Sequence, residues 1–375
     1  MRAYVYTDAS LDRYAGRFVW LSINTEDAKN AAFLKKYPIP VLPTLLVLDP
    51  KRDAIALRYI GGATVAQLRR MLDESSAKKA PSPSELLLAQ GDKLANAGDH
   101  AGAAVFYEQA LDKAPKSWPR YGRAAESLLF SLMMGQQHEH CVTLARFVYP
   151  RVRGTSSAAN VASTGLTCAT QLDEKRSGRA ELIAELEKDT QEVFDDPKLT
   201  LSGDDRSGLY MSLIEARAAV KDEAGEKKLI EDWSAFLDRE AANAKTPEQR
   251  AVYDPHRLSA YIELKTPEKA IPMLAQSERE FPNDYNPPAR LAVAYREMKK
   301  YDEALAASDR ALRLAYGPRK LGMLTTRADI YTEKGDKESA RKTLAEAIAY
   351  AKSLPDPQRN DRRIAALEKK LAAMQ

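Results

Sequence analysis

Residues 91–115 read GDKLANAGDHAGAAVFYEQALDKAP and decide how most of the chain folds. Two amphipathic stretches follow one another here, and Pro115 ends the second. Ala103, Tyr107 and Ala110 lie along one stripe of the second stretch if it is helical. Small residues let two helices approach, and an aromatic ring fills the gap between neighbouring pairs. This stretch therefore predicts a hairpin of two helices.

The same spacing returns near the C-terminal end of the chain. Tyr261, Tyr295 and Tyr331 recur at intervals of 34 and 36 residues, and Ala270, Ala304 and Ala340 recur at the same intervals. Generic amphipathic helices do not keep a fixed interval, so this recurrence predicts a stack of repeated helix hairpins.

Three weaker helix pairs fill the middle of the chain, which gives about seven hairpins in all. The expected pairs are 121–134 with 139–149 (closed by Pro150), 156–172 with 179–194, and 205–220 with 226–244. The pattern resembles the tetratricopeptide repeat family over residues 85–355, with a capping helix at 356–375. The expected fold of this part is an all-α solenoid, so the chain is mainly α overall.

The resemblance implies a protein or peptide client, bound in a groove that the first helix of each hairpin lines. The candidate groove residues at those positions are Leu88, Asp92, Val293, Arg296, Thr325 and Asp329. Only Arg296 suits a carboxylate, so a grip on an acidic C-terminus is not expected. A mostly apolar groove would take a hydrophobic segment or be filled by the chain's own N-terminal domain.

Residues 1–74 read as an α/β domain. Alternation and β-forming residues predict a strand at 18–23, a short helix follows at 27–37, and a continuous apolar run predicts a buried strand at 44–48. A turn leads to a second strand at 54–60, antiparallel to the one before it, and Thr64 is placed to cap a closing helix.

This order resembles the thioredoxin family, on residues 41–45, Asp49-Pro50 and 59–62. The resemblance implies a cis peptide bond before Pro43 and a loop that docks an extended polypeptide, here Val41, Leu42, Pro43 and Thr44.

The chemistry of that family needs two neighbouring thiols, and no cysteine precedes Cys141. The domain is therefore expected to be incomplete, without its first strand or its Cys-x-x-Cys pair. One hypothesis is an interaction scaffold with a degenerate docking domain and no catalytic residue. The alternative is a thiol–disulfide oxidoreductase, acting in cell redox homeostasis, whose cysteine pair lies upstream of Met1 and whose repeats select the substrate.

Cys141 and Cys168 are read as two separate buried side chains, although a disulfide between neighbouring helices stays open. The cysteines and the four histidines fit no metal pattern, and no cofactor is expected. The polar residues 75–84 are expected to be a linker.

The net charge of +4 comes from scattered Lys and Arg, which does not suggest nucleic acid. No apolar run is long enough to span a membrane, so a soluble protein is expected. The first residues form no signal peptide, which places the chain as given in the cytoplasm, whereas an upstream start would allow export to the periplasm. The oligomeric state stays open.

Overall fold

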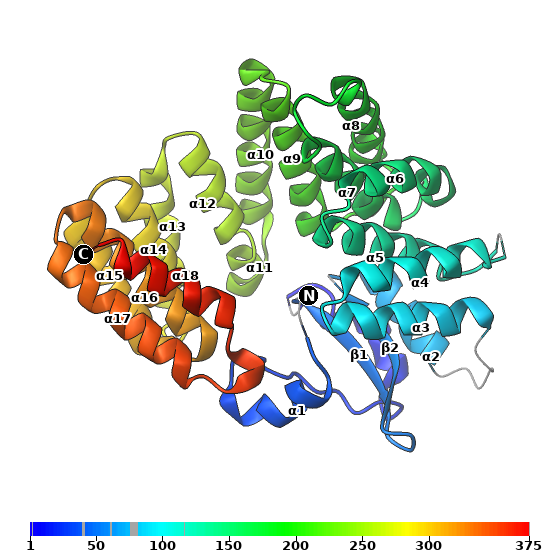
Figure 1. The fold of residues 1–375 in the computed structure, drawn as a ribbon, viewed down its shortest axis with the longest axis horizontal. Helices are drawn as coiled ribbons and strands as arrows, with labels where there is room; N and C mark the ends of the chain where they lie inside the picture. The colour runs from blue at the N-terminus through cyan, green and yellow to red at the C-terminus, as the bar shows by residue number, and fades with distance from the viewer. Residues whose placement is uncertain (2, 40–41, 61, 76–81, 116, 375) are drawn as a thin grey trace. The chain divides into compact units, whose positions relative to one another are not determined.

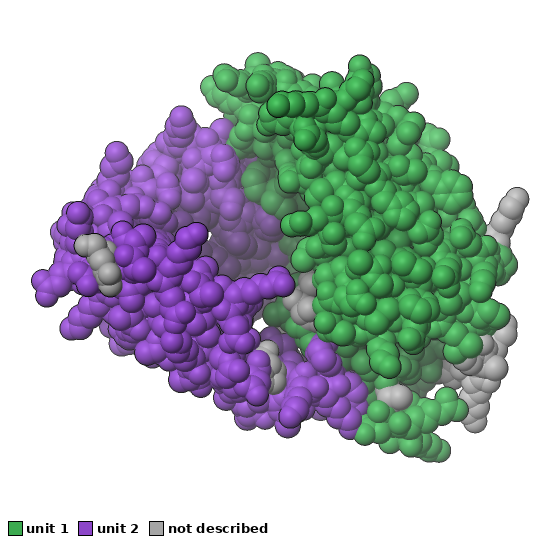
Figure 2. All heavy atoms as spheres, in the orientation of Figure 1, with its two compact units in different colours: residues 1–18, 39–233 green, residues 19–38, 234–375 purple. Residues whose placement is uncertain are grey.

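The computed structural model describes residues 1–375 except 2, 40–41, 61, 76–81, 116 and 375 (Figure 1). The chain divides into two compact units, shown in different colours in Figure 2. Unit 1 contains Met1–Phe18 and Ile39–Trp233, and unit 2 contains Val19–Pro38 and Ser234–Gln375. A short N-terminal segment therefore belongs to the same unit as the C-terminal helices.

Helix hairpins make up most of unit 1. Its helices are α3 (Pro83–Asn96), α4 (His100–Asp112), α5 (Tyr121–Met134), α6 (His138–Val152), α7 (Ser157–Thr170), α8 (Arg179–Asp195), α9 (Gly203–Ala219) and α10 (Glu223–Asn243), the last of which continues into unit 2. We call α3, α5, α7 and α9 the first helices of their hairpins. The six helices of the three middle pairs expected from the sequence are present, and α5 packs on α6 and α7 on α8.

Close approach inside the first hairpin depends on Gly91. A Cβ atom at Gly91 would lie 2.6 Å from the Tyr107 ring, so the aromatic side chain packs directly on the glycine backbone. Tyr107, Ala103 and Ala110 are all fully buried. The expected packing of small and aromatic residues is confirmed here.

The N-terminal part of unit 1 contains a 3₁₀ turn (Ala9–Tyr14), strands β1 (Thr44–Asp49) and β2 (Ala54–Ile60), and helix α2 (Val65–Ser75). The strands are antiparallel, and Thr44 pairs with Ile60. The expected cap is present, because the Thr64 hydroxyl accepts the Gln67 amide at 3.2 Å. Tyr14, Leu57 and Leu68 belong to the small core between the strands and α2.

One prediction for this part is corrected. Phe18–Ile23 is not a strand, and the side chains of Val19 and Leu21 are 88% and 73% exposed. An apolar alternating run becomes a strand only where a neighbouring strand pairs with it. The sheet has two strands among the described residues, so a complete thioredoxin-like domain is not shown; the sequence predicts an incomplete one.

Unit 2 begins with the segment Val19–Pro38, which carries a 3₁₀ turn (Ala28–Asn30) and α1 (Ala31–Lys36). Its C-terminal helices are α11 (Pro247–Ala251), α12 (Asp254–Glu263), α13 (Ala270–Glu280), α14 (Asn286–Glu297), α15 (Tyr301–Leu314), α16 (Gly317–Lys334), α17 (Lys337–Ser353) and α18 (Asp361–Ala372), with 3₁₀ turns η3 (Pro267–Lys269) and η4 (Asp356–Gln358). The first helices here are α12, α14 and α16, and α18 packs against α17.

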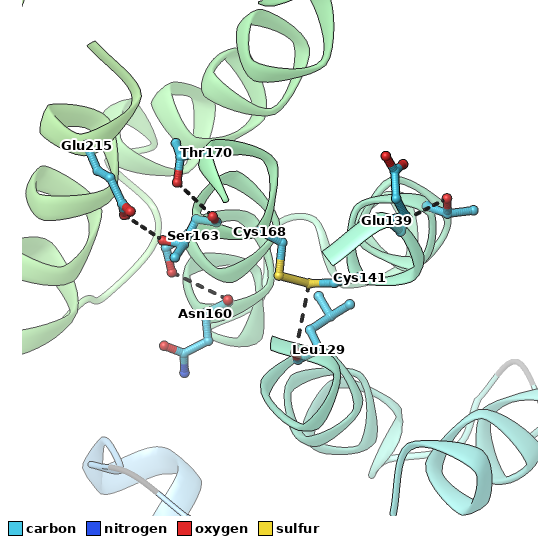
Figure 3. Close-up of a disulfide and its surroundings, with 10 residues drawn as sticks. Leu129, Glu139, Cys141, Asn160, Ser163, Cys168, Thr170 and Glu215 are labelled. Carbon is cyan, nitrogen blue, oxygen red and sulfur yellow. Dashed lines mark hydrogen bonds between the residues drawn. A yellow bond between two sulfur atoms is a disulfide. The ribbon is translucent and has the colours of Figure 1, made fainter. Parts of the chain in front are cut away.

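Two details of the helical array also differ from expectation. Pro150 does not close its helix, because α6 continues through it to Val152. Cys141 and Cys168 are buried but not separate, since they form a disulfide that joins α6 to α7 (Figure 3). Their Cα atoms lie 6.2 Å apart, within the range for a disulfide, and only helix packing could bring them there.

The expected linker 75–84 contains residues 76–81, which lie outside the described residues. Ser75 is the last residue of α2, and Pro83 is the first of α3. Arg120 connects the two sides of this stretch, because it lies 2.9 Å from Glu74 on α2 and 3.7 Å from Glu85 on α3.

Candidate polypeptide-binding sites

The six predicted groove residues are engaged within the chain rather than gathered in one site. Leu88 is 1% exposed in the core of unit 1, and Val293 packs partly buried against a core of unit 2. Arg296 pairs with Glu333, Asp329 pairs with Lys370, and the Thr325 hydroxyl donates to the Leu321 carbonyl at 2.9 Å. Asp92 alone lies where another segment of the chain meets a first helix.

The predicted docking loop is described in part. Val41 lies outside the described residues. The Leu42–Pro43 peptide bond is cis, as the resemblance implies, and the Leu42 side chain is 52% exposed. Thr44 opens β1.

Strand β2 meets the first helices through Arg123 of α5. The Arg123 guanidinium donates to the backbone carbonyl oxygen of Arg58 in β2 and to the Asp92 carboxylate of α3, the latter at 2.6 Å. The Tyr107 hydroxyl donates to the same carboxylate at 2.9 Å. Burial alone lowers the pKa of Arg123, but Asp92 and Tyr107 reverse this and leave the pKa above its ordinary value. A permanent cation on a first helix therefore holds a strand by its backbone.

Glu126 lies one turn further along α5. Its Oε1 is buried and has no hydrogen-bond partner among the described residues. Burial raises the pKa of the Glu126 carboxyl to about 7, Asp205 adds to the shift, and Ser157, Asn160 and Arg123 oppose it. This carboxyl group therefore changes charge near neutral pH on the face where α5, α7 and α9 follow one another.

Unit 2 holds its own N-terminal segment at the beginning of two first helices. The Glu26 carboxylate pairs with Arg319 of α16 and accepts the hydroxyl of Tyr285, the residue before α14, at 3.4 Å. Its side chain is only 14% exposed. Burial and the Glu26 carboxylate raise the pKa of Tyr285 to about 12, so Tyr285 remains a neutral donor.

Backbone contacts complete this site. A Cβ atom at Gly317 would overlap the Glu26 carbonyl oxygen, and Gly317 has a φ of +54°, which favours glycine. The Gln358 side-chain amide in η4 donates to the Thr25 carbonyl at 3.0 Å, and Asn24 donates to the Tyr316 hydroxyl at 2.6 Å. The site thus binds one acidic side chain and the backbone of the residue before it.

Sequence reasoning did not single out Arg123, Glu126, Glu26, Tyr285 or Arg319. A usable signal was present only at residues 316–319, where an aromatic residue, Gly and Pro precede an arginine at a helix start. Glu26 and Arg319 are 293 residues apart, so no local pattern links them.

Other kinds of site are not indicated in the part of the chain that the structure describes. It contains no group of three His, Cys, Asp or Glu residues arranged to hold a metal ion. None of its helices combines the length and apolar character needed to cross a membrane.

Residues 285–353 match the family model of the tetratricopeptide repeat. This part of the chain is similar to the tetratricopeptide repeat. The matched residues span α14 to α17 and include Tyr285 and Arg319. The repeat predicted from Tyr295, Tyr331 and their neighbours is thereby confirmed in this region.

Solved structures of repeat proteins resemble the chain weakly. A tetratricopeptide repeat protein from Parabacteroides merdae shares 13% identity, with a TM-score of 0.45 over 77% of this chain and 98% of that one. A thermophilic tetratricopeptide repeat protein from Thermus thermophilus gives 15% identity and 0.28 over 78% and 98%, and the TPR2AB domain–pHSP90 complex of yeast Sti1 gives 15% and 0.28 over 77% and 98%. Scores of this size establish no shared function. No curated protein matches the chain.

Proposed function

We propose that the chain is a protein-interaction scaffold whose first helices hold polypeptide segments of client proteins. One observation carries this proposal: in both units, side chains at the first helices hold a non-helical segment of the chain itself. In unit 1 the donor is Arg123 on α5, and in unit 2 the clamp is Arg319 on α16. The contact of Arg123 to a backbone carbonyl does not depend on the sequence of the bound segment, whereas Arg319 binds the carboxylate of Glu26.

A finer part of the proposal concerns residues 1–74, which we infer to be a thioredoxin-like docking domain lacking redox cysteines. The strands β1 and β2 followed by α2 support it, together with the exposed Leu42 at the loop before β1. Thiol–disulfide exchange needs sulfur atoms that a substrate can reach, whereas both cysteines of this chain are fully buried in the helical array. Docking without redox chemistry is therefore the function we propose for the chain.

The disulfide also bears on the compartment. Disulfides persist mainly in oxidising environments and are uncommon in the cytosol. The buried Cys141–Cys168 bond thus supports an exported location over the cytoplasmic one expected from the N-terminal sequence.

Site-specific photocrosslinking tests the scaffold function. The protein is produced in the organism that it comes from, with a photoreactive phenylalanine analogue in place of Met211. Met211 is 44% exposed on the first helix α9. The matched control carries the same group at Phe147, which is 63% exposed on the second helix α6. A client is expected to crosslink at Met211 and not at Phe147. The same products at both positions would contradict recognition by the first helices.

A further inference from the structure

The contacts around Glu26 have the composition of a ligand site. A cation and a hydroxyl converge on one carboxylate, an amide reaches the preceding carbonyl, and a glycine permits direct backbone contact. Charge-assisted hydrogen bonds of this kind are among the stronger polar interactions in proteins. Each of these donors belongs to the helical array, and each of the acceptors that they meet belongs to residues 24–26.

The geometry selects a polypeptide over a free anion. A free carboxylate could occupy the Arg319–Tyr285 clamp, but it would leave the Gln358 amide without its carbonyl. Because Gly317 sets the Glu26 backbone directly on α16, the distance from backbone to clamp is fixed. A side chain one methylene shorter would not reach the clamp without losing the backbone contact.

We propose that Tyr285, Gly317, Arg319 and Gln358 form a recognition site for a glutamate-bearing polypeptide segment, that residues 24–30 of the chain are its resident occupant, and that an acidic segment of a partner protein displaces them. This proposal rests on the scaffold function proposed above and names one site and the chemistry of its ligand.

The contacts that hold the resident segment in the site can be exchanged. The contacts that Asn24, Thr25 and Glu26 make with the array are polar, and the Arg319 side chain is 52% exposed, so water can replace these contacts one at a time. On the N-terminal side of the resident segment Val19 and Leu21 are largely exposed, whereas on its C-terminal side Leu34 and Tyr37 are buried and anchor the chain next to the site. The resident has the advantage of being tethered, which raises its effective concentration. A partner segment must therefore bind better than the resident or act when the resident is weakened.

A binding assay with the full-length chain tests the proposal. The probe is a fluorescently labelled peptide with the sequence of residues 22–37, and its anisotropy is measured against wild type and Glu26→Ala. The Glu26→Ala chain, whose resident lacks the carboxylate, is expected to bind at least tenfold more tightly than wild type. Adding Arg319→Ala to Glu26→Ala should abolish the gain, whereas adding Arg313→Ala, an arginine in the last turn of α15, should not.

Substitutions in the peptide and at Gly317 test which contacts the binding depends on. Peptides carrying Glu26→Gln or Glu26→Asp should bind at least tenfold more weakly than the parent. In the Glu26→Ala background, Gly317→Ala should abolish binding, while Gly335→Ala should not. Gly335 has a φ of +88° and open space around it, so it reproduces the backbone strain without the clash. Circular dichroism checks that each variant folds.

Three results would overturn the proposal. The first is equal binding of the parent and Glu26→Gln peptides. The second is a failure of the peptide to bind Glu26→Ala while crosslinks at Met211 still form, which would reject this site and leave the scaffold function standing. The third is dimerisation of the wild-type chain that Arg319→Ala abolishes, which would make a second copy the occupant instead of a partner.

Discussion

At the scale of single residues, two glutamates show how surroundings set the role of a carboxylate. Glu26 meets Arg319 and Tyr285, so its charge is matched by a cation and a donor. Glu126 has a buried oxygen without a partner among the described residues, and Asp205 contributes a further negative charge. The first arrangement stabilises the ion, whereas the second opposes it.

Glu126 predicts a pH dependence of stability in unit 1. Its folded pKa of about 7 lies above the unfolded value of 4.5, so the folded state binds the extra proton between these values. Stability from this group is therefore present at low pH and lost as pH rises through 7. Three other titratable groups interact electrostatically with Glu126: Arg123 on the same helix, Asp205 on α9 and Tyr59 on β2.

We expect Glu126→Gln to flatten the unfolding free energy between pH 5 and 8. At pH 8 the variant should be more stable than wild type, by about 1–3 kcal/mol, because a tenfold change in proton affinity corresponds to about 1.4 kcal/mol. Urea titrations across this range measure it, and Glu346→Gln on the exposed face of α17 is the control. If the variant kept the wild-type dependence of the unfolding free energy on pH, ionisation of Glu126 would not destabilise the folded state.

At the scale of elements, the hairpins depend on glycine and alanine at helix contacts. The Tyr107 ring packs on the backbone of Gly91. A Cβ atom at Gly165 of α7 would lie 2.6 Å from the Ala145 Cβ of α6. By contrast, Gly208 in α9 has nothing within 4 Å of its missing Cβ. The same residue type is therefore required at one helix position and replaceable at another.

A pair of alanine substitutions separates these two situations. Gly91→Ala should lower the free energy of unfolding by about 1–2 kcal/mol, because the new methyl group displaces a buried ring. Gly208→Ala should raise it by about 0.5–1 kcal/mol, because alanine favours the helix. Thermal and urea unfolding of both variants measures the difference. Equal effects of the two substitutions would contradict the proposed contact with Tyr107.

The disulfide is the second feature at this scale, since it connects two neighbouring hairpins. Its cysteines are 27 residues apart in sequence. Reduction should lower the free energy of unfolding by about 3–4 kcal/mol, the entropy change expected for releasing a loop of that length. Unfolding with and without a phosphine reductant measures the effect. A Cys141→Ser/Cys168→Ser chain is the control, and a comparable response in it would disprove the crosslink as the cause.

At the scale of the whole molecule, each unit has its own hydrophobic cores. The cores of unit 1 lie around Leu128 and Tyr14, and those of unit 2 lie around Leu274 and Leu344. In repeat arrays each hairpin contacts mainly its neighbours, so the effect of a substitution stays local. The exception is the segment Val19–Pro38, which belongs to unit 2 although its neighbours in sequence belong to unit 1.

Hydrogen exchange should show this locality. Gly91→Ala is expected to reduce the protection of backbone amides in α3 to α5 and to leave α14 to α17 unchanged. Arg319→Ala should act oppositely, exposing the amides of residues 24–30 and the beginning of α16 while unit 1 keeps its protection. Mass spectrometry of peptic fragments measures both. Loss of protection throughout the chain in either variant would indicate one cooperative unit instead of two.

Local patterns in the sequence determined a large part of this structure. The spacing of Gly91, Ala103 and Tyr107 predicted a helix hairpin, and the apolar run at Thr44 with the turn after it predicted the two strands. Thr64 predicted the start of α2. These features follow from side-chain periodicity and from hydrogen bonds between residues close in sequence, so the chain specifies them segment by segment.

Only the tertiary structure decided the rest. Packing of α6 on α7 paired two cysteines that the sequence left as separate side chains. The run Phe18–Ile23 has strand-like alternation, but a strand also needs a neighbour, and the sheet did not supply one. Glu26 acquired its role from Arg319, which lies 293 residues further along the chain. Such contacts depend on where whole elements meet, and periodicity within one element carries no information about that.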